Sequence, residues 1–201
     1  MVDTYHLQYE IKYLEEMAGE IPTKILPRTM DAFYSRQYVY TRIDGFFSQF
    51  TLVQIADLKR NQVTTLLDFF GTHVSCTGKP GELPAGINVP DQLVMRFTDD
   101  TTTIGGYLSE RIEVETAEEQ YDIYYTREIR IRHPNISTPY QTVNYPLTAF
   151  RIQLSHLKMH LTCKNSEYKP VGSEMFKISE MYKPVSREAM EDIINNLFTK
   201  D

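Results

Sequence analysis

A stretch rich in proline and glycine separates two parts of this sequence whose apolar residues follow different periods. Residues 75–90 contain three glycines and three prolines, a composition that excludes regular helix or strand. Before Gly71 the apolar residues recur every three or four positions, whereas after Pro90 they alternate with polar ones. A period of 3.6 is typical of helices and a period of two is typical of strands. The sequence therefore predicts helices first and strands second.

Three helices are predicted before Gly71. The first ends at Gly19, a residue type that often follows the last turn of a helix. The second begins near Pro27, and the third covers residues 55–70. The apolar face of the first helix consists of Leu7, Ile11, Leu14 and Ala18.

Two apolar alternations after Pro90 predict an antiparallel hairpin. A four-residue turn at 117–120 places Val114 opposite Ile123 and Ile112 opposite Tyr125, with all four side chains on the buried face. A shift of one residue would expose the whole apolar set. We therefore expect this register.

The C-terminal third of the chain carries two further local signals. The apolar parity changes at Ser155, which indicates a turn or a bulge between two strands. Ser186 precedes an apolar stripe of helical period and is a typical N-cap. We expect a strand pair, or one long bent strand, followed by a final helix.

Together these patterns predict an α+β fold, in which an N-terminal helical layer is followed by an antiparallel β-sheet and a C-terminal helix. Residues 1–74 are expected to form the helical layer, 75–90 a Pro/Gly-rich loop or arm, and 91–201 the sheet with its helix. A chain of 201 residues with 41% hydrophobic residues can bury a single core. We expect one structural domain.

Charge and composition disfavour several classes of partner and cofactor. The net charge is -6 and the basic residues are scattered, which disfavours nucleic-acid binding. Polar residues interrupt each apolar stretch near the N-terminus, so no signal peptide or membrane span is expected. Cys76 and Cys163 lack metal-ligand spacing and are expected to be reduced thiols. We predict no cofactor, no metal and a cytoplasmic location.

Two His-x-Ser/Thr tripeptides form the one pattern with catalytic content: His73-x-Ser75 and His160-x-Thr162. One imidazole can act as a base and the other as an acid, while the hydroxyls donate to phosphoryl oxygens. At these residues the chain is similar to the 2H phosphoesterase family, in which two such motifs on neighbouring strands face one phosphate. The resemblance implies that His73, Ser75, His160 and Thr162 are catalytic, with a cyclic or RNA-derived phosphate as substrate.

The same residues also have a structural interpretation. His73 follows a predicted helix end, where the dipole favours a protonated ring, and His160 lies on the solvated face of a strand. Glu113 and Glu115 share a strand face, but arginines on the same hairpin make a solvated charged surface the simpler interpretation than a metal site.

These observations favour a non-enzymatic interaction or assembly subunit of a larger complex, such as a component of a viral or phage particle assembled in the cytoplasm. The 14 tyrosines and the long loop suit a contact surface better than a catalytic pocket. The expected partners are other proteins or further copies of the chain, bound through the 75–90 arm and the sheet edges. A 2H-like phosphoesterase is the alternative, and the separation of His73 from His160 distinguishes the two.

Overall fold

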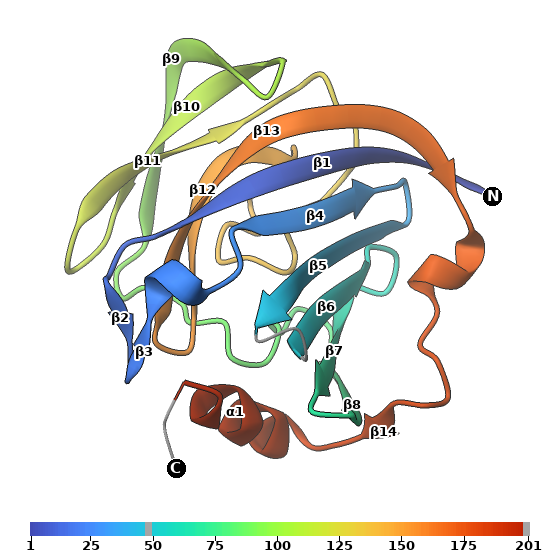
Figure 1. Cartoon of the computed structure of the whole chain (residues 1–201). Coiled ribbons are helices and arrows are strands. Elements are labelled where there is room, and N and C mark those ends of the chain that lie inside the picture. The colour runs from blue at the N-terminus through green and yellow to red at the C-terminus, as the bar shows by residue number, and fades with distance from the viewer. Residues whose placement is uncertain (47–49, 199–201) are drawn as a thin grey trace.

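The computed structural model describes residues 1–46 and 50–198. Residues 47–49 and 199–201, which fall within the predicted first and third parts of the chain, lie outside this description. The described chain is mostly β-strand, arranged as one strongly curved sheet (Figure 1).

The elements follow one another along the chain with short connections except between β8 and β9 and between β11 and β12. The first eight strands are β1 (Val2–Tyr13), β2 (Met17–Ala18), β3 (Ile21–Pro22), β4 (Thr29–Tyr34), β5 (Tyr38–Phe46), β6 (Phe50–Asp57), β7 (Gln62–Phe69) and β8 (Thr72–Thr77). The later strands are β9 (Val94–Ile104), β10 (Tyr107–Glu115), β11 (Gln120–Tyr125), β12 (Leu147–Leu154), β13 (Leu157–Val171) and β14 (Lys183–Pro184). The helical elements are η1 (Thr23–Ile25), η2 (Ser173–Phe176) and α1 (Arg187–Asn196).

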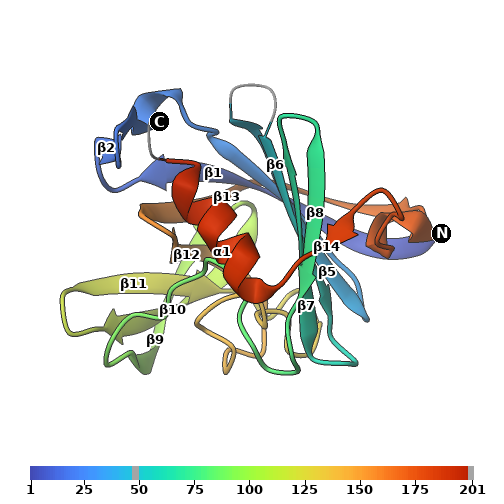
Figure 2. The ribbon, with the colours of Figure 1, turned by 90° about the horizontal axis from the view of Figure 1, so that it is seen from below.

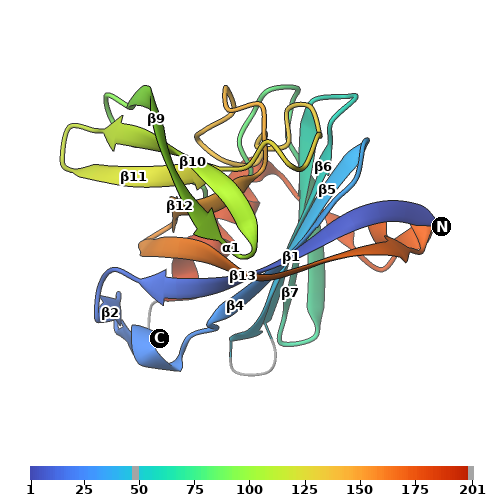
Figure 3. The ribbon, with the colours of Figure 1, turned by 90° about the horizontal axis from the view of Figure 1, so that it is seen from above.

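Twelve of these strands form the main sheet, in the order β14-β8-β7-β6-β5-β4-β1-β13-β12-β11-β10-β9. Neighbours pair antiparallel, apart from the short parallel pair of β14 with β8. The long strands β1 and β13 lie at the centre of this order and pair from Val2 opposite Val171 to Tyr13 opposite Met159. Figure 3 shows the β4–β8 half and the β9–β12 half diverging from this central pair.

The predicted α+β fold is wrong, because the described part of residues 1–74 forms strands β1 to β8 instead of a helical layer. In β1 the buried apolar residues are Leu7, Tyr9 and Ile11, which alternate. The helical pattern counted Leu7 and Ile11 as neighbours on one face and passed over Tyr9, which is fully buried. Tyrosine packs well on a half-buried sheet surface, so it should be included among the apolar residues when the period of a segment is determined.

The third predicted helix is wrong for a different reason. β7 is covered on both faces, because Leu67 packs in the main core while Leu66 packs in a second cluster on the opposite face. Phe176 of η2 covers that second cluster and stacks on Tyr38 with ring centroids 5.1 Å apart. A strand buried on both faces has a nearly continuous apolar run, which resembles a buried helix in periodicity.

The main core lies on the inner, concave face of the curved sheet. Tyr9, Phe150 and Leu157 from the central strands are among its members. Helix α1 crosses the open side and places Met190 and Ile194 in the same core (Figure 2). The helix has the predicted N-cap, since the Ser186 side chain accepts a hydrogen bond from the Ala189 backbone N–H.

Two predicted hairpins are present, one of them with a different register. β12 and β13 form a tight hairpin whose turn contains Ser155 at φ 53°, as the parity change predicted. In the β10–β11 hairpin, Ile112 lies opposite Ile123 instead of Tyr125. The shift is an even number of residues, so the buried face is the predicted one even though the partners differ.

The 75–90 segment is held by its own chain. It begins within β8, and Ala85 and Ile87 are buried in the main core. The Ser155 backbone N–H donates to the Gly86 carbonyl, and Arg187 of α1 donates to the Leu83 carbonyl. The segment predicted to be a Pro/Gly-rich loop or arm therefore packs on its own domain.

Candidate functional site

His73 lies on the outer face of β8, where a carboxylate orients its ring. Its Nδ1 is 2.7 Å from Asp68 Oδ1, and the Tyr182 hydroxyl donates to the other Asp68 oxygen at 3.0 Å. Ser75 is on the same face but buried, next to the core strands. Among the residues described, no nucleophilic side chain is hydrogen-bonded to the His73 ring. The arrangement is a His73–Asp68 pair that Tyr182 supports through Asp68.

His160 lies on the outer face of β13, directly opposite Arg151 of β12 and Lys12 of β1. Burial of the ring lowers the pKa of His160, and the positive charges of Arg151 and Lys12 lower it further. Thr162 is on the same strand, opposite Glu10. This histidine is therefore surrounded by cations.

The structure does not bring the two His-x-Ser/Thr motifs together. Five strands, β7, β6, β5, β4 and β1, lie between β8 and β13. At about 4.8 Å per strand spacing, six spacings separate the motifs by roughly 29 Å along the sheet. Both histidines face outward from a curved sheet, so the curvature turns their side chains away from each other. His73 and His160 share no phosphate site in this arrangement.

A third histidine, His6, is enclosed by acceptors. Its Nε2 is 2.7 Å from Asp31 Oδ1 and its Nδ1 is 3.1 Å from Glu167 Oε1. The ring also stacks on Phe33, with centroids 4.3 Å apart. Because both ring nitrogens already face carboxylates, neither is free to act on a substrate. We interpret this cluster as structural.

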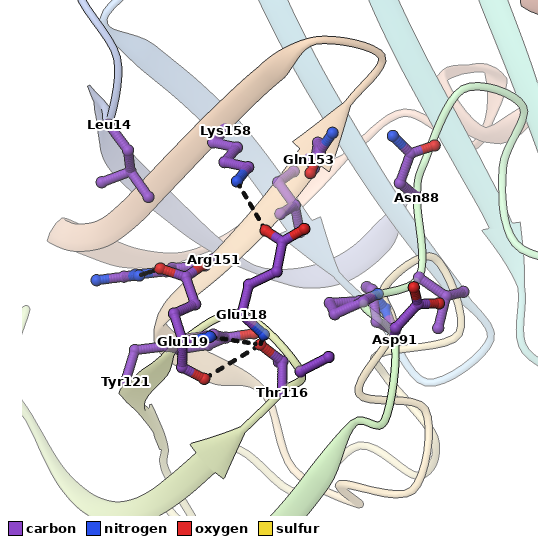
Figure 4. Close-up of a pocket in the computed structure, with 15 residues that line it drawn as sticks. Leu14, Asn88, Asp91, Thr116, Glu118, Glu119, Tyr121, Arg151, Gln153 and Lys158 are labelled. Atoms are coloured by element: carbon purple, nitrogen blue, oxygen red, sulfur yellow. Dashed lines mark hydrogen bonds and ion pairs between the residues drawn. The ribbon is translucent and has the colours of Figure 1, made fainter.

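A polar cleft of about 340 Å³ lies between three segments: the β10–β11 turn, the loop before β9, and the β12–β13 hairpin (Figure 4). The two acidic side chains of the turn point toward basic residues of the hairpin. Glu119 pairs with Arg151 at 2.8 Å, and Glu118 pairs with Lys158 at 3.3 Å. The Arg151 guanidinium also lies over the Tyr121 ring, 4.6 Å from its centroid.

The turn that carries these acids is organised by one hydroxyl. Thr116 Oγ1 accepts hydrogen bonds from the backbone N–H groups of Glu118 and Glu119. This local pattern is typical of Ser/Thr turns. The acids and bases of the cleft pair with one another, so an ionic group that displaces one member of a pair would meet the charge of the other.

A second concave surface, here called the tyrosine–arginine groove, has a volume of about 600 Å³. Three tyrosines form a row across its floor, because Tyr5 of β1 lies opposite both Tyr34 of β4 and Tyr168 of β13. Tyr5 and Tyr168 make an edge-to-face contact at 5.1 Å. Arg36, Arg130, Asp3 and Glu128 complete the charged part of the lining.

The groove was not predicted from the sequence. Tyr5 and Tyr168 are separated by most of the chain, and only the β1–β13 pairing brings them together. The high tyrosine content suggested a contact surface, but it did not indicate which tyrosines form that surface.

The described residues form neither a metal centre nor a membrane-spanning helix. Within residues 1–46 and 50–198, no group of three or more His, Cys, Asp or Glu side chains could hold a metal ion. No helix in this part of the chain is long and apolar enough to cross a membrane.

Comparison with known proteins identifies the fold alone. Two crystal structures of PNGF-II, in space groups C2 and P21, superpose on 97% of this chain with TM-scores of 0.61 and 0.63. The sequence identities are 13% and 12%. The chain spans about a third of the PNGF-II chain, 33% and 34% in the two structures. No protein-family model and no curated protein matches the sequence.

Proposed function

We propose that this protein is a non-enzymatic interaction subunit of a larger assembly, and that it binds its partner through the tyrosine–arginine groove. A viral or phage particle is one setting for such a subunit. The observation that carries the proposal is the row of Tyr34, Tyr5 and Tyr168, which runs from the buried core to the surface.

The composition of the groove supports a protein partner. Tyrosine and arginine are enriched in the residues that dominate protein–protein binding energy, because each offers a large contact area and a polar end. Tyr168 has 60% of its surface exposed, so this large aromatic side chain has room for further contacts. A groove with a rigid, hydrogen-bonded floor is also preorganised for binding, which limits the entropy lost in the complex.

The charges favour an acidic partner segment. Within the described residues, neither Arg36 nor Arg130 forms an ion pair with an acidic side chain. The two groove carboxylates, by contrast, are already engaged, because Glu128 accepts a hydrogen bond from the Leu108 backbone N–H and Asp3 accepts one from the Tyr168 hydroxyl. The two guanidinium groups are the available charges, and guanidinium binds carboxylates with two parallel hydrogen bonds. The proposed partner presents an extended segment with Asp or Glu beside apolar residues.

Peptide binding tests this proposal. A set of fluorescent peptides with the same apolar residues and different net charges is titrated with wild-type protein and with the Arg36→Gln/Arg130→Gln variant. We expect the acidic peptides to bind wild type, and the double variant to bind them at least about tenfold more weakly, as the loss of a charge-assisted contact implies. Lys59→Gln/Arg60→Gln, on the β6–β7 turn, is the matched control and should retain binding.

Two results would contradict the proposal. One is equal affinity of the two double variants for acidic peptides, which would remove any role for the groove. The other is hydrolysis of a cyclic phosphodiester by the purified protein with loss of that activity in His160→Ala, which would establish the phosphoesterase alternative instead.

A further inference from the structure

Three basic side chains lie in one row across the outer face of the central strands. Lys12 of β1 and Arg151 of β12 each lie directly opposite His160 of β13. Lys158 is two residues from His160 on the same face of β13, opposite Gln153. Lys12 and Arg151 place positive charge on both sides of the His160 ring, and Lys158 adds a third cation on the same face. Negative charge nearby stabilises such a concentration of cations.

The negative charge comes from the β10–β11 turn, through the pairs Glu119–Arg151 and Glu118–Lys158. These two pairs do not use every donor of the row. The Arg151 Nε is buried and has no hydrogen-bond partner among the residues described, and the same holds for Nδ1 of His160. Buried polar atoms are normally hydrogen-bonded, so two such atoms on neighbouring side chains mark an unusual site.

The turn is attached weakly to the strands that it neutralises. β11 pairs with β12 at only two positions, Tyr124 with Ala149 and Tyr125 with Leu147, and the register is irregular between them. The Glu118 and Glu119 side chains are 78% and 40% exposed. Ion pairs this exposed are weak and exchange readily with solutes. The two carboxylates can leave the row while the sheet stays intact.

We propose that the cleft of Figure 4 binds a small molecule carrying a phosphate or carboxylate group, and that Glu118 and Glu119 occupy the positions of its anionic oxygens when it is absent. Arg151 binds the anion with Lys158 beside it, and Tyr121 holds the guanidinium in place from below. The cleft volume of about 340 Å³ falls in the range of small-molecule sites.

The test measures whether removal of the internal carboxylates improves anion binding. Wild type and Glu118→Gln/Glu119→Gln are titrated with inorganic phosphate and, separately, with succinate at constant ionic strength, using calorimetry and amide NMR shifts. We expect the double variant to bind at least one of the two anions about tenfold more tightly than wild type, because two partly exposed ion pairs no longer compete. Preference for phosphate or for succinate identifies which group the natural ligand carries.

Two further variants assign the site. Arg151→Gln in the Glu118→Gln/Glu119→Gln background should lose the binding, and Lys158→Gln serves the same purpose if the Arg151 variant has a lowered melting temperature. Arg96→Gln/Glu113→Gln breaks an exposed ion pair of 3.2 Å on the neighbouring β9–β10 pair and should bind as wild type does. The proposal is overturned if Glu118→Gln/Glu119→Gln binds both anions no more tightly than wild type, or if its binding persists in both the Arg151 and the Lys158 variants.

Discussion

The hydroxyls of Tyr9 and Tyr34 lie 3.0 Å apart in the core, and Tyr9 also donates to the Leu147 carbonyl at 2.7 Å. This chain of hydrogen bonds connects β4, β1 and β12. Burial raises the pKa of Tyr34 to about 12 and also raises the pKa of Tyr9 well above its ordinary value, so both hydroxyls stay protonated and can donate at neutral pH.

Tyr9→Phe is therefore expected to destabilise the fold. The substitution leaves the buried Leu147 carbonyl and the Tyr34 hydroxyl without this partner, and a buried unsatisfied group costs about 1 to 3 kcal/mol. Urea unfolding measures the difference in free energy. Tyr124→Phe, at a half-buried position of β11, is the control, and its free energy of unfolding should decrease much less. Equal losses in the two variants would show that the Tyr9 hydroxyl has no special role.

Gly105→Ala is expected to cost more stability than Gly106→Ala. Both glycines have positive φ, 60° and 87°, so each alanine variant is strained. At Gly105 a Cβ would also lie 2.5 Å from the Cys163 sulfur, whereas at Gly106 no atom lies within 4 Å. Overpacking of this kind costs about 1 to 3 kcal/mol. Thermal unfolding of the two variants should differ by this amount, and equal melting temperatures would exclude the close contact.

His160 is expected to make the fold sensitive to acid. Burial and the neighbouring Arg151 and Lys12 lower the pKa of His160 below its ordinary 6.5, so the unfolded chain binds this proton more tightly than the folded one. The contribution of His160 to the free energy of unfolding is fully present above about pH 6.5. It is lost as the pH falls from there through the pKa of the folded state.

His160→Gln should remove this part of the acid sensitivity. The variant and wild type are unfolded with urea at about pH 8 and about pH 5, and the variant should lose less stability between them. Ring-proton NMR of wild type should show His160 titrating below 6.5. The same pH-dependent loss in both proteins would contradict the expected shift.

The two thiols are expected to be unreactive in the native protein. Burial raises the pKa of Cys163 to about 11 and also raises the pKa of Cys76, so little thiolate is present at neutral pH. Both are free and buried. Iodoacetamide should label neither until urea unfolds the chain, as followed by mass spectrometry. Rapid labelling of Cys163 in native buffer would show that β13 opens near Gly105.

Local signals predicted several elements correctly. The parity change at Ser155 indicated a turn or a bulge, and the structure has a turn there. Ser186 offered a side-chain acceptor to the first turn of α1. The hairpin faces were also predicted, but the turn occupies residues 116–119 because Glu115 pairs with Gln120. The Thr116 hydroxyl stabilises that turn through contacts with two backbone N–H groups, a detail that apolar alternation does not contain.

Long-range pairing explains what the sequence did not reveal. Leu66 and Leu67 are both buried because the sheet is covered on two faces, and no local pattern states that a second cover exists. The cation row depends on Lys12 lying opposite His160, which follows from the β1–β13 register. His160 could be selected from its motif, but its neighbours could not.

The central position of β1 and β13 has a consequence for how the chain acquires its structure. Val2 pairs with Val171, so the first strand has its second neighbour only after most of the chain has been synthesised. Closing so long a loop is entropically costly, and sheets dominated by distant pairings fold slowly. Until then one edge of β1, with its apolar residues Leu7, Tyr9 and Ile11, is exposed to other chains. During synthesis at high expression levels, aggregation should therefore begin at the N-terminal strand, and chaperone binding there should increase the soluble yield.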